Sequence, residues 1–224
     1  MLQALAETLQ AWDAAIFRAI HLGMHHDALD PVMMALTDPG RFKGPLIVVA
    51  CLLFTLRRAR GALALVVLVA TLACSDQVSA KVLKPIFQRS RPSVQLADSK
   101  PLFGVRKSYA MPSVHAVNFT AVLPILATVF PAGAIPYGIY AGLVCLSRIY
   151  VGDHWPFDVL AGMALGLALG LLGRKAFLRL ERNAKGWRWY QRMEQWRRKQ
   201  PGVEPTGEVT VSGARFEGAP SAVR

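Results

Sequence analysis

Residues 147–158, SRIYVGDHWPFD, place an arginine, a histidine and two aspartates between two long apolar runs. Ionisable side chains at membrane depth are costly, so they are usually paired with one another and functional. Two more segments carry side chains of the same kind, KPIFQRSRP at 84–92 and PSVH at 112–115. Together the three segments offer four cations, two imidazoles, serine hydroxyls and two carboxylates.

This set of side chains suits the cleavage of a phosphate ester. Lys and Arg donors can neutralise the phosphate oxygens and the charge of the transition state. One histidine can attack phosphorus, and a carboxylate four residues later can orient that histidine. The second histidine can protonate the departing oxygen. A metal site made by the histidines with Asp153 and Asp158 is the alternative, but the interleaved Lys and Arg would repel a cation. We therefore expect neither a metal nor a cofactor.

Five apolar segments are expected to cross a membrane and to position these motifs. Their ranges are 44–56, 61–83, 113–130, 134–151 and 157–173. Residues 3–22 have apolar side chains at helical spacing, interrupted by Glu7, Asp13 and Arg18, which predicts an amphipathic helix at the interface or against the bundle. The predicted fold is all-α: a polytopic membrane helix bundle with five clear spans plus this N-terminal helix, which would make six spans if it also crosses.

Composition agrees with a membrane protein. Apolar residues make up 53% of the 224 residues, and the net charge is +12. Such a charge suits anionic lipid or phosphate, and the apolar runs argue against nucleic acid as the partner. Three cysteines lie inside apolar runs and are expected to be small buried side chains rather than disulfides or zinc ligands: Cys51, Cys74 and Cys145. The N-terminus lacks a basic region, so no cleaved signal peptide is expected.

Charge also predicts the orientation of the bundle. Arg57, Arg58 and Arg60 separate the first two spans, and ten basic residues lie between Arg174 and Lys199. The positive-inside rule places both groups in the cytoplasm, so the 84–112 loop and the 147–158 segment share the outer face of the plasma membrane. The outer loop is basic too, which we attribute to binding of an anion.

The chain is expected to divide into three parts. Residues 1–176 form the membrane-embedded domain, and residues 201–224 form a disordered tail. Residues 177–200 interleave basic and aromatic side chains, which suits either a helix on the anionic inner leaflet or a solvated basic tail. Gly162, Gly166 and Gly170 recur every four residues, which favours close helix packing within the bundle; a dimer is a weaker alternative, and the oligomeric state is not predicted.

The motifs resemble those of the type-2 phosphatidic acid phosphatase superfamily, whose signature is K-x6-RP, PSGH and SR-x5-H-x3-D. Both the order and the internal spacing of the motifs match. By this resemblance His154 is the nucleophile, His115 the general acid and Asp158 the residue that orients His154. Lys84, Arg91 and Arg148 form a phosphate clamp, and Ser113 with nearby backbone N–H groups adds donors at a helix start.

One position departs from the signature: Val114 stands where the family has glycine. Valine keeps its backbone N–H for phosphate, but it resists positive φ and its branches crowd an approaching phosphate. A reshaped pocket or slower turnover is the expected consequence.

The resemblance implies a membrane phosphatase that acts on a lipid phosphate or diphosphate through a phosphohistidine. The expected outward-facing site slightly favours undecaprenyl diphosphate as the substrate. The alternatives are a phosphatidylglycerol phosphate or lipid A phosphatase, a lipid phosphotransferase, and a phospholipid-binding protein impaired in turnover by Val114. A haloperoxidase is disfavoured because relatives with that activity are soluble. The expected partners are the lipid substrate and membrane lipids.

Overall fold

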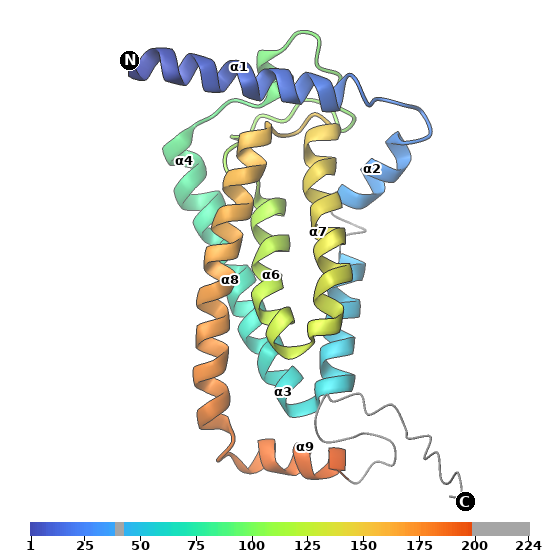
Figure 1. Cartoon of the computed structure of the whole chain (residues 1–224), viewed down its shortest axis with the longest axis vertical. Coiled ribbons are helices and arrows are strands. Elements are labelled where there is room, and N and C mark those ends of the chain that lie inside the picture. Colours follow the sequence, from blue (N-terminus) through green and yellow to red (C-terminus); the bar gives the residue numbers. More distant parts are fainter. Residues whose placement is uncertain (39–42, 199–224) are drawn as a thin grey trace, which may run out of the picture.

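The computed structural model describes residues 1–38 and 43–198, and these residues form helices joined by turns and loops (Figure 1). The helices are α1 (Leu2–His21), α2 (Asp30–Thr37), α3 (Lys43–Gln77), the π-helical η1 (Val78–Leu83), α4 (Lys84–Phe87), α5 (Pro92–Gln95), α6 (Val114–Val129), α7 (Pro131–Tyr150), α8 (Pro156–Ala184) and α9 (Arg188–Arg198). The prediction of an all-α fold is confirmed for the described residues.

Helix α3 contains the first two predicted spans as two arms. Arg58 breaks the helical geometry between them with φ 43° and ψ −116°. A Cβ on Gly61 would overlap the carbonyl oxygen of Leu53, so the glycine lets the two arms approach closely after the bend. The second arm then continues through η1 to Lys84, and this brings the first motif to the end of the bundle.

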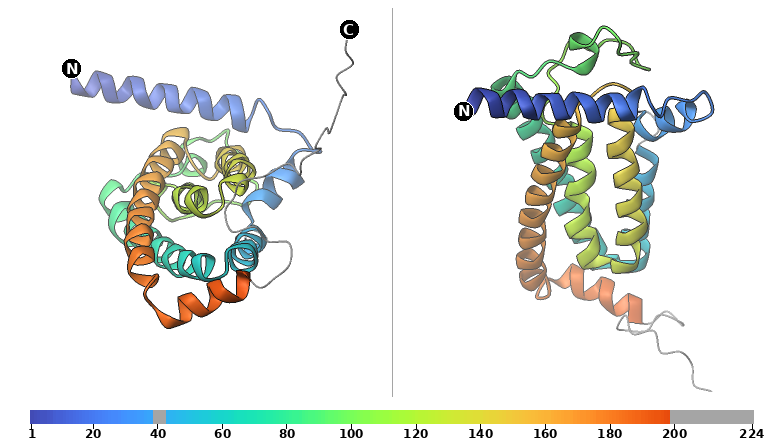
Figure 2. Two further views of the ribbon diagram at one scale, coloured as in Figure 1. Left: turned by 60° about the horizontal axis from the view of Figure 1, so that its bottom comes forward. Right: turned by 45° about the horizontal axis from the view of Figure 1, so that its top comes forward.

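Helix α6 lies at the centre of the bundle, with α3, α7 and α8 around it (Figure 2). Its side chains are buried on several faces, and Phe119, Val122 and Ile125 belong to the main apolar core. A helix that is apolar all round is expected to be buried in this way. The PSVH motif, at the start of α6, is therefore held by the best-packed element of the fold.

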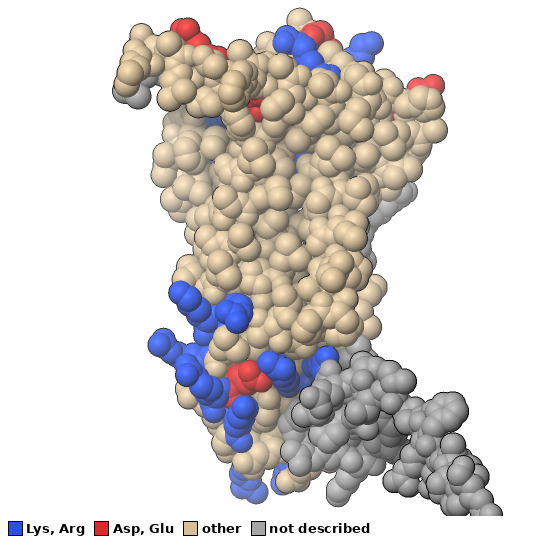
Figure 3. Space-filling view, viewed as in Figure 1, with Lys and Arg blue, Asp and Glu red and all other residues tan. Residues whose placement is uncertain are grey.

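Among the residues that the structure describes, three helical stretches are long and apolar enough to cross a membrane: Arg57–Gln95, Pro131–Tyr150 and Pro156–Ala184. Val114–Val129 is a shorter apolar helix. On the visible face of the molecule the middle of the bundle carries no charge, while Lys and Arg gather at the end near α9 (Figure 3). The count of five spans stays a prediction.

The N-terminal helix lies across the end of the bundle opposite α9, as expected for an amphipathic helix packed against it (Figures 1 and 2). Helix α8 continues to Ala184, beyond residue 173 where the last span was expected to end and beyond the expected domain boundary at residue 176. The predicted disordered tail, 201–224, lies outside the described residues.

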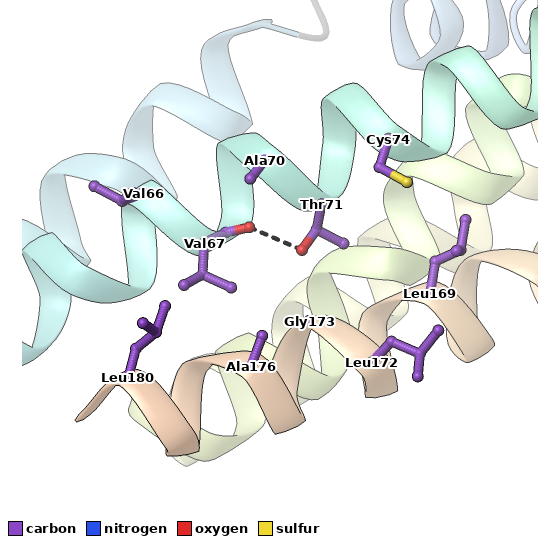
Figure 4. A pocket seen from close by; sticks show the side chains of 10 residues that line it. All are labelled: Val66, Val67, Ala70, Thr71, Cys74, Leu169, Leu172, Gly173, Ala176 and Leu180. Carbon is purple, nitrogen blue, oxygen red and sulfur yellow. Dashed lines mark hydrogen bonds between the residues drawn. The ribbon is translucent and has the colours of Figure 1, made fainter. Parts of the chain in front are cut away.

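The cysteines correct one expectation. Cys145 is buried, but Cys51 and Cys74 are exposed. An apolar run does not reveal which of its faces packs inward, and in a membrane helix an outward apolar face is stable in lipid. Cys74 lines an apolar groove of about 390 Å³ between α3 and α8, where the Thr71 hydroxyl donates to Val67 O at 2.8 Å (Figure 4).

The glycine repeat packs α8 against α6 inside the bundle. A Cβ on Gly166 would overlap both Thr120 Oγ1 and Val117 O, which leaves no room for a side chain. We expect Gly166→Ala to lower the free energy of unfolding by about 1–3 kcal/mol, the cost of overpacking a core. Gly142 on α7 is the matched control, because in the described structure a Cβ there meets no heavy atom within 4 Å. Thermal unfolding in detergent checks both variants, and equal Tm values would contradict the assigned packing.

Candidate active site

The turn between α7 and α8 positions the third motif. The backbone N–H groups of Asp153 and His154 both donate to Arg148 O at 3.2 Å, after Gly152 turns the chain with φ +81°. Helix α8 then starts at Pro156, and the Trp155 N–H donates to the Asp158 carboxylate at 2.9 Å. Proline in the first turn and an acidic residue at the third position are favoured at a helix start. Asp158 therefore caps α8 and faces the histidine one turn before it.

His154 is buried, and its two ring nitrogens face different partners. Nδ1 lies 3.6 Å from Asp158 Oδ2, which is an ion-pair distance rather than a hydrogen bond. Nε2 lies 3.4 Å from Arg91 Nη1. Burial, followed by the charges of Arg148, Arg91 and Lys84, lowers the pKa of His154 well below its usual value. The lowered pKa favours the neutral form of the imidazole.

Arg91 and Arg148, the two arginines predicted to bind phosphate, meet at one carboxylate. The Arg148 guanidinium donates to Asp153 Oδ2 and to Thr37 Oγ1 of α2. Arg91 donates to the carbonyl oxygen of Asp153 at 2.7 Å, and its Nη1 lies 3.7 Å from Asp153 Oδ1. Both guanidiniums are nearly fully buried. Asp153 compensates the two positive charges, which would otherwise be costly to bury.

Lys84 is linked to Arg91 through a backbone carbonyl of the 84–112 loop. Its Nζ donates to Tyr109 O at 2.5 Å, and Arg91 Nη2 reaches the same oxygen at 3.5 Å. Two residues from the first motif thus share one carbonyl oxygen. The first motif is tied to the third by Trp155 Nε1, which donates to Ser90 O at 2.9 Å.

The second motif begins α6 beside the other two. Ser113 precedes the helix; its N–H donates to Asp158 O at 3.0 Å, and its buried hydroxyl has no hydrogen-bond partner in the described part of the chain. A buried unpartnered donor fits a site for a phosphate oxygen. His115 lies in the first turn of α6 and adds to the lowering of the pKa of His154. Val114 is helical with negative φ, so the expected resistance to positive φ does not arise there.

Comparison with known proteins identifies the family. The family model described as "PAP2 superfamily" matches residues 60–182. Phosphatidylglycerophosphatase B of Bacillus subtilis is 33% identical over 179 residues, which are 73% of this chain and 82% of that protein. The chain belongs to the PAP2 superfamily. The resemblance carried by the three motifs is thereby confirmed.

Two further PAP2 proteins are similar over most of the chain. Undecaprenyl-diphosphatase BcrC of B. subtilis is 30% identical over 160 residues, covering 70% of this chain and 80% of that one. The crystal structure of a transmembrane PAP2-type phosphatidylglycerolphosphate phosphatase from B. subtilis superposes with a TM-score of 0.59 at 31% identity, covering 81% of this chain and 90% of that one. Together with its apolar helices, this membership makes the chain a membrane protein.

The structure reveals a second charge network, which the PAP2 signature does not specify. Arg89 donates to Asp158 Oδ1 at 2.8 Å and also to Asp13 Oδ2 of α1. Asp13 is fully buried, and its other oxygen accepts the Phe157 N–H at 2.9 Å. In the sequence, Asp13 is recognisable only as an interruption of an amphipathic helix. An acidic side chain within the apolar face of a helix does suggest a buried ion pair, but it does not identify Arg89 as the partner of Asp13.

We expect Asp13→Asn to destabilise this PAP2 protein and to lower kcat. Loss of the carboxylate charge weakens a buried charge-assisted pair, at a cost of about 1–3 kcal/mol. Arg89 would then pair with Asp158 alone, and this shifts the Asp158 carboxylate away from its position facing His154. Asp98→Asn is the matched control, because it removes an exposed ion pair between α1 and the same loop, Arg18 to Asp98 at 3.1 Å. Tm and kcat of the two variants are compared, and equal effects would contradict a positioning role for Asp13.

Proposed function

We propose that this protein removes phosphate from a lipid phosphate or diphosphate through a phosphohistidine intermediate. The observation that carries the proposal is the buried His154, whose Nδ1 faces Asp158 at 3.6 Å and whose Nε2 lies 3.4 Å from Arg91 Nη1. The relatives that match most of the chain are named as a phosphatidylglycerophosphatase and an undecaprenyl-diphosphatase, which supports a lipid substrate.

The proposed reaction has two steps. His154 Nε2 attacks phosphorus, a nitrogen–phosphorus bond forms, and the bond from phosphorus to the leaving oxygen breaks as His115 donates a proton to that oxygen. Water then attacks phosphorus and gives a proton to His115, the new oxygen–phosphorus bond forms as the nitrogen–phosphorus bond to His154 breaks, and inorganic phosphate leaves. Lys84, Arg91, Arg148 and the Ser113 hydroxyl hold the phosphate oxygens during both steps. Asp158 keeps Nδ1 of His154 protonated, so that Nε2 carries the lone pair.

Phosphate release from purified lipid phosphates tests this function. The panel contains undecaprenyl diphosphate, the substrate favoured by an outward-facing site. It also contains phosphatidylglycerol phosphate, because a relative covered over 82% of its length is named as a phosphatidylglycerophosphatase. Because fixed cations hold the phosphate, we propose a metal-independent reaction that survives EDTA and is inhibited by vanadate. Activity lost to EDTA and restored by a divalent ion would overturn the clamp mechanism.

The same assay separates hydrolysis from phosphoryl transfer to another lipid. Transfer would give a new lipid phosphate when an acceptor lipid is added, whereas hydrolysis gives inorganic phosphate with or without it. No release from any member of the panel, in protein whose Tm is raised by vanadate, would favour a phospholipid-binding protein that has lost turnover.

We further propose that the site faces the outside of the plasma membrane, on the charge asymmetry of the helix ends. Ala97 in the loop near the site and Asn183 near the end of α8 are exposed and suit cysteine labelling. In intact cells, Ala97→Cys should react with a membrane-impermeant maleimide, and Asn183→Cys should react only after permeabilisation. The reverse pattern would invert the orientation.

A further inference from the structure

Asp153 is a buried acid at the centre of the phosphate clamp, and the proposed reaction gives it no step. It occupies one of the unspecified positions of the SR-x5-H motif and is 1% exposed. Its Oδ2 accepts from Arg148, while its Oδ1 lies 3.7 Å from Arg91 Nη1 and 3.4 Å from Arg106 Nε. One carboxylate thus meets three guanidiniums.

Two of these guanidiniums are the groups that would hold the phosphate. Arg91 Nη1 is 3.4 Å from the His154 nitrogen that attacks, so a phosphate placed for attack must lie beside Arg91. That phosphate and the Asp153 carboxylate are both anions, and both need the same donors in a site with little water. Like charges at such short range repel strongly, so both anions cannot use these donors fully at once.

We propose that Asp153 is a built-in competitor of phosphate, which occupies Arg91 and Arg148 in the empty site and is displaced from them when a phosphate group binds. This inference rests on the proposed function. Arg106 is placed to keep the displaced carboxylate paired, because its side chain is 35% exposed and can follow the movement.

The competition favours lipid phosphates over free phosphate. Inorganic phosphate has only its oxygens with which to displace Asp153, whereas a lipid phosphate adds the binding of its headgroup and chains. Binding energy from remote parts of a substrate can offset such an unfavourable local change. The same competition speeds release of the inorganic phosphate product, since Asp153 returns to the arginines as phosphate leaves.

Asp153→Asn tests the proposal, because asparagine keeps the size and removes the charge. In the full-length protein in detergent, the inhibition constant of inorganic phosphate should fall by roughly tenfold to a hundredfold. This is the scale of one charge-assisted hydrogen bond between Asp153 and an arginine, which phosphate would no longer have to break in order to bind. Asp153→Glu keeps the competing charge, so its inhibition constant for inorganic phosphate should stay much closer to that of wild type. Asp98→Asn, on the exposed loop, should not change the constant.

A second measurement keeps the test decisive if Asp153→Asn is unstable. Tighter binding to the folded state raises Tm more at a given ligand concentration, so vanadate should raise the Tm of Asp153→Asn by more than it raises that of wild type. Equal or weaker binding of phosphate and vanadate by Asp153→Asn, with binding by wild type intact, would overturn the competition and leave the phosphatase proposal standing. If wild type binds neither anion, the phosphate clamp itself is refuted, and the inference fails with it.

Discussion

His154→Ala should abolish the phospho-enzyme and reduce turnover by about 10⁶-fold, the scale seen when a catalytic nucleophile is removed. The alanine methyl cannot form a bond to phosphorus, and no other imidazole is placed with one nitrogen towards Asp158 and the other towards Arg91 within the described residues. The measurement is rapid quench with a radiolabelled lipid phosphate, followed by detection of an acid-labile phosphohistidine.

His25→Ala is the control for this variant. His25 lies outside the three motifs, and its side chain is 38% exposed beside Asp30. Turnover should be unchanged. A labelled phospho-enzyme in His154→Ala would show that another residue attacks phosphorus.

His115→Ala should lose about 10²–10⁴-fold on a lipid phosphate, the usual share of general acid catalysis. A lipid alkoxide is a poor leaving group and needs the proton, whereas p-nitrophenolate leaves without one. The loss on p-nitrophenyl phosphate should therefore be much smaller. Rates are measured against leaving-group pKa for the wild type and for both histidine variants.

The comparison between substrates distinguishes a general acid from a structural residue. Misfolding or loss of phosphate binding would impair both substrates alike. An equal loss of rate on the two leaving groups would therefore remove His115 from the role of acid.

The elements of the site that could be predicted from the sequence are those encoded over short distances. The four-residue step from His154 to Asp158 forecast that the two would face each other, and helical periodicity predicted α1 to within one residue at each end. Long apolar runs likewise gave α6 and α7. Each of these features depends on neighbours only a few residues away in the sequence.

Features that depend on distant packing were not predictable in the same way. Arg89 and Asp13 are 76 residues apart, and nothing local to either reveals the pair. In the sequence Asp153 is only a candidate metal ligand, because two of its three arginine partners, Arg91 and Arg106, come from a distant segment. The exposure of Cys51 and Cys74 depends on which face of α3 packs inward, and an all-apolar helix contains no pattern from which to read it.

Within the described residues, the hydrogen bonds and ion pairs that attach helix α1 to the bundle are made with residues that follow much later in the chain. His21 Nδ1 is 2.6 Å from Tyr150 O, and its Nε2 accepts the Lys100 N–H at 3.0 Å. Asp13 pairs with Arg89 and accepts from Phe157. On the ribosome, none of these contacts can form before residue 89 has been made, and the set is incomplete until residue 157 has left the exit tunnel. Helix α1 is therefore fixed in place only after α7 has been made and α8 has begun.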